Sequence, residues 1–309
     1  MTGRAPAGRD GLEAAVAAEL AAPSPPDAAT EAAETLARDI VARHGDAVAA
    51  VLFYGACRRD GDASGLLDLY VLTAGHRAFH RRALPALLNA ALPPNVVLWR
   101  CEGPRGPVRA KVAALSQSQF ERRMRPGSLD TTLWARFCQP STLVHARDEA
   151  ARRRAERAVA RAVETAVLWA LRLEPGAETP AEHWRGLFAR TYAAELRAER
   201  GGRPDRLLDA APDWYDRVFP LALARLDPPR GWERRGERPW ALRRAAGKAL
   251  NVARLAKAAF TFEGGADYLA WKVERHSGVA VRLTDWQRRH PLLAAPAVLW
   301  RLRRRGAVR

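Results

Sequence analysis

The hydrophobic periodicity of this chain changes near residue 147, and this change constrains the fold more than any other feature. Upstream of it, short apolar runs of the kind found in strands alternate with helical patterns. Downstream, residues 148–309 are almost entirely helical in pattern, with long Ala/Arg segments at residues 148–173 and 179–200. Strands followed by a run of helices predict an α+β chain, in which a mixed-sheet domain carries a helical domain.

Strand-like and helical stretches alternate in the upstream part. A helix is expected over residues 28–44, and the apolar run "VAAVLFYG" predicts a buried strand that ends at Gly55. A polar loop leads to a second strand that carries Asp68 between leucines. The segment "HRAFHRRALPALLNAAL" has helical spacing, whereas "NVVLWRC" and "PVRAKVAALS" are typical of strands joined by the turn-forming "EGPRGP". A short strand is expected in "QPSTLVH", and the domain boundary is placed near Arg147.

The two ends of the chain have their own composition. Residues 1–26 are rich in Ala and Pro, lack a continuous apolar core and contain acids, so they predict a disordered leader rather than a signal peptide. Residues 27–147 are then the sheet domain and residues 148–309 the helical domain. No stretch reaches the roughly 20 apolar residues of a spanning helix. The tail "HPLLAAPAVLWRLRRRGAVR" predicts a basic amphipathic segment that lies on an anionic membrane.

The charge of the chain points to an anionic partner. Lys and Arg number 51 against 34 Asp and Glu, a formal net charge of +17. Nucleic acid is disfavoured, because no zinc-finger spacing, RNP-like strand or helix-turn-helix signature occurs. Six tryptophans sit among arginines in the helical part: Trp214, Trp232, Trp240, Trp271, Trp286 and Trp300. They fit packing between helices and, alternatively, an interface with lipid head groups.

Cysteines and histidines give no metal signature. The three cysteines, at positions 57, 101 and 138, are far apart and form no CxxC pair, which is typical of buried thiols in a reducing compartment. His76 and His80 share a helix face, but no carboxylate accompanies them and no HExxH motif occurs. Zinc chemistry is therefore not expected.

The turn after the first strand and the acid on the second suggest phosphate chemistry. Glycine has no Cβ, so a turn at Gly55 lets backbone N–H groups approach a polyphosphate. A carboxylate on the neighbouring strand, Asp68, can hold Mg²⁺ against the phosphates while the α-phosphorus is attacked. Taken alone, these residues fit better with an ordinary solvated or capping acid at a strand edge.

Several segments in order resemble the mitochondrial-type phosphatidate cytidylyltransferase, the peripheral CDP-diacylglycerol synthase family. They are "FYGACRRDGDASGLLDLYVL", "FHRRALPALLNAAL", "VRAKVAALS", "LWARFCQPSTLVH", "LFARTYAAELRAE" and "RLAKAAFTFEGGADYLAWKVERHSG". Each motif is degenerate, and their order and spacing are the specific part. The resemblance runs over almost the whole chain beyond residue 45.

The resemblance implies a nucleotidyltransferase-type mixed-sheet domain followed by an all-helical C-terminal domain. It implies Mg²⁺-dependent phospholipid biosynthesis in which CTP and phosphatidic acid give CDP-diacylglycerol and pyrophosphate, in the cytoplasm at the inner face of the cell membrane. The site residues that it implies are Tyr54, Gly55, Ala56 and Lys111 for the nucleotide, Asp68, Lys111, Glu195 and Arg197 for catalysis, Asp68 and Glu195 for the metal, and Lys257, Tyr268 and Lys272 for the substrate phosphate.

The rarity of lysine favours these matches. Arginine fills nearly every cationic position, and the chain has only four lysines. Three of them, Lys111, Lys257 and Lys272, fall where the family motifs also have one, while Lys248 is expected on the surface. A compact ammonium is not replaced by a guanidinium without a change in geometry.

Departures from the family pattern keep two alternatives open. Ala56 replaces the turn serine, Gln139 replaces a motif lysine, and Glu195 replaces an aspartate. Tyr70 stands where an Asp-x-Asp enzyme has its second acid, so a second metal contact would depend on Glu195 or on the loop acids at 60 and 62. The alternatives are a nucleotidyltransferase acting on another lipid phosphate, and a catalytically degenerate relative that binds anionic lipid.

Overall fold

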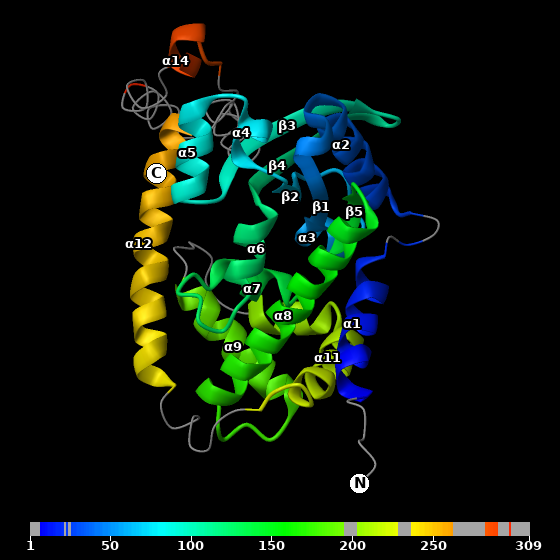
Figure 1. The fold of residues 1–309 in the computed structure, drawn as a ribbon, viewed down its shortest axis with the longest axis vertical. Helices are drawn as coiled ribbons and strands as arrows, with labels where there is room; N and C mark the ends of the chain where they lie inside the picture. Colours follow the sequence, from blue (N-terminus) through cyan, green and yellow to red (C-terminus); the bar gives the residue numbers. More distant parts are fainter. Residues whose placement is uncertain are drawn as a thin grey trace.

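A five-stranded mixed sheet forms the upstream half of the protein, as the computed structural model shows (Figure 1). The structure describes residues 7–21, 23, 26–194, 203–227, 236–261, 282–289 and 297. The strands lie in the order β3-β4-β2-β1-β5. Their bounds are Val48–Tyr54 for β1, Leu67–Thr73 for β2, Asn95–Gly103 for β3, Gly106–Ser116 for β4 and Thr142–Ala146 for β5. Only β2 and β4 pair in parallel, and the other pairs are antiparallel. The expected α+β class with a mixed sheet is confirmed.

One face of the sheet is covered by helix α2 (Ala28–His44). The helix starts at Asp27, whose Oδ1 accepts a hydrogen bond of 2.7 Å from the backbone N–H of Thr30. Leu36 and Ile40, one helical turn apart, are fully buried against alternate residues of the strands. The short 3₁₀ helix η1 (Gly45–Ala47) then turns the chain into β1.

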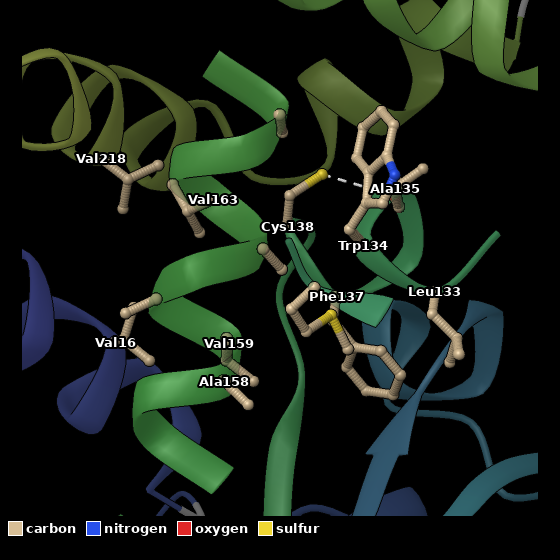
Figure 2. Packing of buried hydrophobic residues seen from close by; sticks show 14 of the residues in the cluster. Val16, Leu133, Trp134, Ala135, Phe137, Cys138, Ala158, Val159, Val163 and Val218 are labelled. Carbon is tan, nitrogen blue, oxygen red and sulfur yellow. Dashed lines mark hydrogen bonds between the residues drawn. The ribbon is translucent and has the colours of Figure 1, made fainter. Parts of the chain in front are cut away.

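The opposite face of the sheet packs on helices α6 (Gln117–Arg123), α7 (Thr132–Phe137) and α8 (Glu149–Leu173). Figure 2 shows this core from close by, with residues of α7 and α8 on facing sides and the thiol of Cys138 directed back to the carbonyl of Ala135, to which it donates at 3.3 Å. Residues from both sides of the boundary expected near Arg147 belong to one apolar cluster. The sheet and the first helices downstream of it therefore share a core.

The elements described beyond residue 147 are all helices. After α8 they are α9 (Pro180–Ala194), α10 (Arg203–Asp209), α11 (Pro212–Leu223), α12 (Glu237–Thr261) and α14 (Asp285–Arg289). Trp214 and Trp240 are buried in the core, and the indole N–H of Trp214 donates to the carbonyl of Cys138 at 2.9 Å. These two tryptophans therefore pack between helices, whereas Trp286 is 53% exposed. Trp232, Trp271 and Trp300 lie outside the described residues.

The disordered leader expected over residues 1–26 is wrong for most of its length. Residues Ala7–Leu20 form helix α1, which packs on α8 and α11. Its Leu12, Val16 and Leu20 recur every four residues and are buried in the main core. That apolar stripe is a helical signal which the abundance of Ala and Pro obscured.

The single helix expected over residues 76–92 is two helices, α4 (His76–His80) and α5 (Ala83–Ala91). The break is at Arg81, whose φ of 55° is left-handed. Helix α12 runs along the side of the molecule from the helical part up to α5 (Figure 1). Within the described ranges, no helix combines the length and apolar content needed to cross a bilayer. Apart from Ala297, the predicted amphipathic tail lies outside the described residues.

Candidate functional site

Three of the expected site residues form one row across the sheet. Tyr54 of β1 is directly opposite Asp68 of β2, and Asp68 is directly opposite Lys111 of β4. Residues paired in register project from the same face of a sheet. Tyr70, two residues beyond Asp68, belongs to the core on the side of α7 and α8, so the row faces the helical part of the molecule. Asp68 is half-buried and Lys111 is exposed.

Gly55 brings the backbone against the Asp68 carboxylate. Its φ of 94° and ψ of −165° belong to a region that is essentially restricted to glycine. A Cβ atom at this position would lie 2.8 Å from Oδ2 of Asp68, so a side chain there would displace the acid. The turn and the acid are thus in contact, as the phosphate-cradle hypothesis requires. Helix α3 (Ala56–Asp60) begins at the next residue, and Ala56 itself is exposed.

The loop that connects α3 to β2 is held by its own polar groups. The Sγ atom of Cys57 lies 3.5 Å from the carbonyl oxygen of Leu66, to which it donates. Burial raises the pKa of this thiol, and the charge of Asp68, followed by those of Asp62 and Asp60, raises it further. Asp62 accepts hydrogen bonds from the backbone N–H and the hydroxyl of Ser64, at 2.7 and 2.6 Å. Its carboxylate therefore stabilises the turn.

Arg136 is a candidate site residue that the sequence reasoning missed. Its Nη1 donates a hydrogen bond of 2.8 Å to the hydroxyl of Tyr70. Its guanidinium carbon lies 5.3 Å from the ring centre of Tyr54 and 5.9 Å from that of Tyr70. Tyr70, at the position of a second acid, therefore holds a permanent cation beside the row. No spacing signal marks this arginine, because α7 is only six residues long.

Lys257 lies at a different place from Lys111. It is buried on α12, and its Nζ donates to the carbonyl of Leu92 and to that of Pro94 at 2.7 Å. Burial, together with the charges of Arg254 and Arg123, lowers its pKa to about 8. These bonds fasten α12 to the connection between α5 and β3. Its expected role at the substrate phosphate stays a prediction.

The remaining expected site residues, Glu195, Arg197, Tyr268 and Lys272, lie outside the described residues. Among the residues that are described, no group of three or more His, Cys, Asp and Glu is arranged to hold a metal. Mg²⁺ commonly takes one or two protein carboxylates together with substrate phosphate oxygens and water. A single carboxylate beside a glycine turn, as Asp68 is, fits that mode of binding.

Comparison with known proteins adds a neighbour in structure and none in sequence. No family model matches the chain, and no curated protein matches it. The chain is similar to the crystal structure of a nucleotidyltransferase-like protein from Exiguobacterium sibiricum, to which it is 13% identical. The match covers 88% of this chain and 91% of that one, with a TM-score of 0.28. At such a score, residues of the two chains are not matched one to one.

Proposed function

We propose that this protein is a phosphatidate cytidylyltransferase, which converts CTP and phosphatidic acid to CDP-diacylglycerol and pyrophosphate at a membrane surface with Mg²⁺. One observation carries the proposal. The carboxylate of Asp68 touches the glycine turn at Gly55 and is paired in register with Lys111. An acid, an ammonium and a turn without a side chain are the groups that nucleotidyl transfer needs in one place.

Nucleotidyl transfer requires that the reactants are positioned and that the charge on the phosphates is neutralised. An oxygen of the phosphatidate phosphate forms a bond to the α-phosphorus of CTP, and the bond to the bridging oxygen breaks, so its electron pair leaves with pyrophosphate. No nucleophilic side chain is required. Bound Mg²⁺ would neutralise charge on the phosphates. Gly55 lets the backbone lie close against the Asp68 carboxylate, and Lys111 supplies a cation on the same face of the sheet.

Arg136 supplies a second cation in this proposal. A guanidinium is always protonated and carries five N–H donors in a planar fork, so it can hold both the Tyr70 hydroxyl and a phosphate oxygen. Tyr70 stands where Asp-x-Asp enzymes have their second acid. In this chain the arginine that Tyr70 holds, Arg136, would then neutralise charge on the phosphates. Tyr70→Phe removes the bond that orients this side chain. We expect weaker binding of CTP, measured calorimetrically, and little change in the binding of cytidine, which lacks phosphates.

Pyrophosphate release from CTP and phosphatidic acid vesicles tests the proposed activity. We expect Mg²⁺-dependent release by the full chain and none by Asp68→Asn, whose side chain keeps its shape and loses its charge. Asp46→Asn is the matched control, since Asp46 is an exposed acid preceding the other end of β1. Equal rates for the two variants would remove Asp68 from the chemistry.

Two alternatives have observations in their favour. A nucleotidyltransferase that acts on another lipid phosphate would use the same row of Tyr54, Asp68 and Lys111. Incubation with labelled CTP, ATP and GTP and a panel of lipid phosphates distinguishes this alternative from the proposed activity. A degenerate lipid-binding protein is favoured by Ala56, which lacks the turn hydroxyl, and by Gln139. The side-chain amide of Gln139 donates to the carbonyl of Ala135 at 2.8 Å, so it bonds to the end of α7. That alternative predicts vesicle binding without release of pyrophosphate.

A further inference from the structure

Helix α5 presents an apolar face to solvent. Leu84 is 62% exposed and Leu87 is 66% exposed, and the other exposed residues of the helix are Ala83, Ala90 and Ala91. Its one polar side chain, Asn89, is completely buried. A surface helix usually places its apolar residues inward and its polar residues outward. Here the polar side chain is inside and the leucines are outside.

The inner face of α5 explains how the helix stays in place without those leucines. The Oδ1 of Asn89 accepts from the backbone N–H of Asn95 at 3.2 Å, and its Nδ2 lies 2.7 Å from Nε2 of His80. The amide of Gln119 donates to the carbonyls of Asn89 and Ala90, at 3.2 and 2.9 Å. A hydrogen-bonded core of this kind anchors α5 to β3 and α6. The outward leucines therefore take no part in holding α5 to the elements described around it.

The charged residues that α4, α5 and their link contribute next to this face have one sign. Arg77, Arg81 and Arg82, on α4 and its link to α5, are all exposed. No Asp or Glu occurs in the sequence between Asp68 and Glu102. Helices α4 and α5 lie at one end of the molecule, away from α9 and α11 (Figure 1). Leucines beside arginines and without acids suit a surface that is apolar inside and negatively charged outside.

We propose that the outer face of α5 docks on an anionic lipid bilayer. Leu84 and Leu87 enter the boundary between head groups and acyl chains, and Arg77 and Arg82 bind lipid phosphates. Arg81 lies between them and donates through Nη2 to the carbonyl of Arg43. The inference deepens the proposed function and rests on it in one respect, that the substrate is a membrane lipid. It names a docking surface within the described residues, separate from the C-terminal tail that the sequence analysis assigned to the membrane.

Co-sedimentation with vesicles tests the docking surface with no nucleotide present. The full chain and Leu84→Ser/Leu87→Ser are compared on phosphatidylcholine vesicles with and without phosphatidylserine. The matched control is Leu223→Ser/Leu242→Ser, which removes two leucines that are 43% and 57% exposed on α11 and α12. We expect the α5 variant to lose at least about tenfold in affinity for anionic vesicles. The control variant and the wild type should bind equally, and all three should unfold at the same temperature.

Three results would overturn the docking proposal. The first is equal vesicle binding by the two double variants, and the second is vesicle binding that does not depend on phosphatidylserine. The third is that the wild type is a dimer in lipid-free solution, that the α5 variant alone is a monomer, and that both bind vesicles equally. The dimer would mean that a second copy covers this face. Pyrophosphate release from short-chain, water-soluble phosphatidic acid separates docking from chemistry. Release by the α5 variant at the wild-type rate supports docking alone as the role of this face. Vesicle binding that depends on α5, with no release from any protein, leaves docking intact and refutes the proposed activity.

Discussion

Gly55 offers the sharpest test of the turn beside Asp68, because two separate features of the structure disfavour a side chain there. Its φ of 94° and ψ of −165° cost an L residue about 1–3 kcal/mol. A Cβ atom would also lie 2.8 Å from Oδ2 of Asp68. The carboxylate is the end of a short side chain and can rotate away, so the backbone sets the magnitude. We expect Gly55→Ala to lower the free energy of unfolding by about 1–3 kcal/mol.

Urea unfolding followed by tryptophan fluorescence measures this loss as a lower midpoint with an unchanged slope. Gly75→Ala is the control, since Gly75 has an extended φ of −166° and nothing lies within 4 Å of an added Cβ. Alanine at a compatible glycine stabilises by roughly 0.4–1 kcal/mol. The control midpoint should therefore stay or rise. Equal midpoints for the two variants would refute the reasoning about the turn.

Two further predictions concern stability. Leu12 of α1 is fully buried, so Leu12→Ala should cost about 2–5 kcal/mol in urea unfolding, whereas Leu223→Ala, at a residue 43% exposed, should cost much less; similar losses would mean that α1 is not part of the core. Burial, and then the charges of His76 and His44, lower the pKa of His80 to about 4, below its ordinary value of 6.5. The folded state disfavours the imidazolium, so this contribution is fully present above pH 6.5 and is lost as the pH falls toward 4. His80→Gln should lose less stability than the wild type between pH 7 and pH 4.5, and parallel losses would contradict the assignment.

The strands were predictable because their signals are local. Apolar runs bounded by Gly, Pro and polar loops place all five within a few residues of their positions in the structure. Two local signals failed. Leu12, Val16 and Leu20 of α1 recur every four residues but are separated mostly by alanine, which carries little contrast between faces. The break at Arg81 has no Gly or Pro to announce it, and its left-handed φ depends on the packing of α4 and α5.

The candidate site was harder to predict because its geometry is not local. The sequence places Asp68 beside Gly55, since a strand, a turn and a strand follow one another. It does not show that β4 pairs with β2 in parallel, which puts Lys111 opposite Asp68. Only the family resemblance brought Lys111 into the site. Arg136 depends on a bond to Tyr70 across 66 positions of the chain, and no pattern in the sequence encodes that bond.

The two proposed surfaces lie at different ends of one strand. Asp68 is near the start of β2, and α4 follows shortly after its end at Thr73. That stretch of extended chain spans roughly 17 Å. A phosphate held at Asp68 would therefore lie well away from a bilayer that touches α5 at its outer face. A lipid acceptor would have to leave the plane of the head groups before it reacts. Its transfer to the row of Tyr54, Asp68 and Lys111 would then be a separate step, and vesicle-bound and water-soluble acceptors should differ in that step and not in the chemistry.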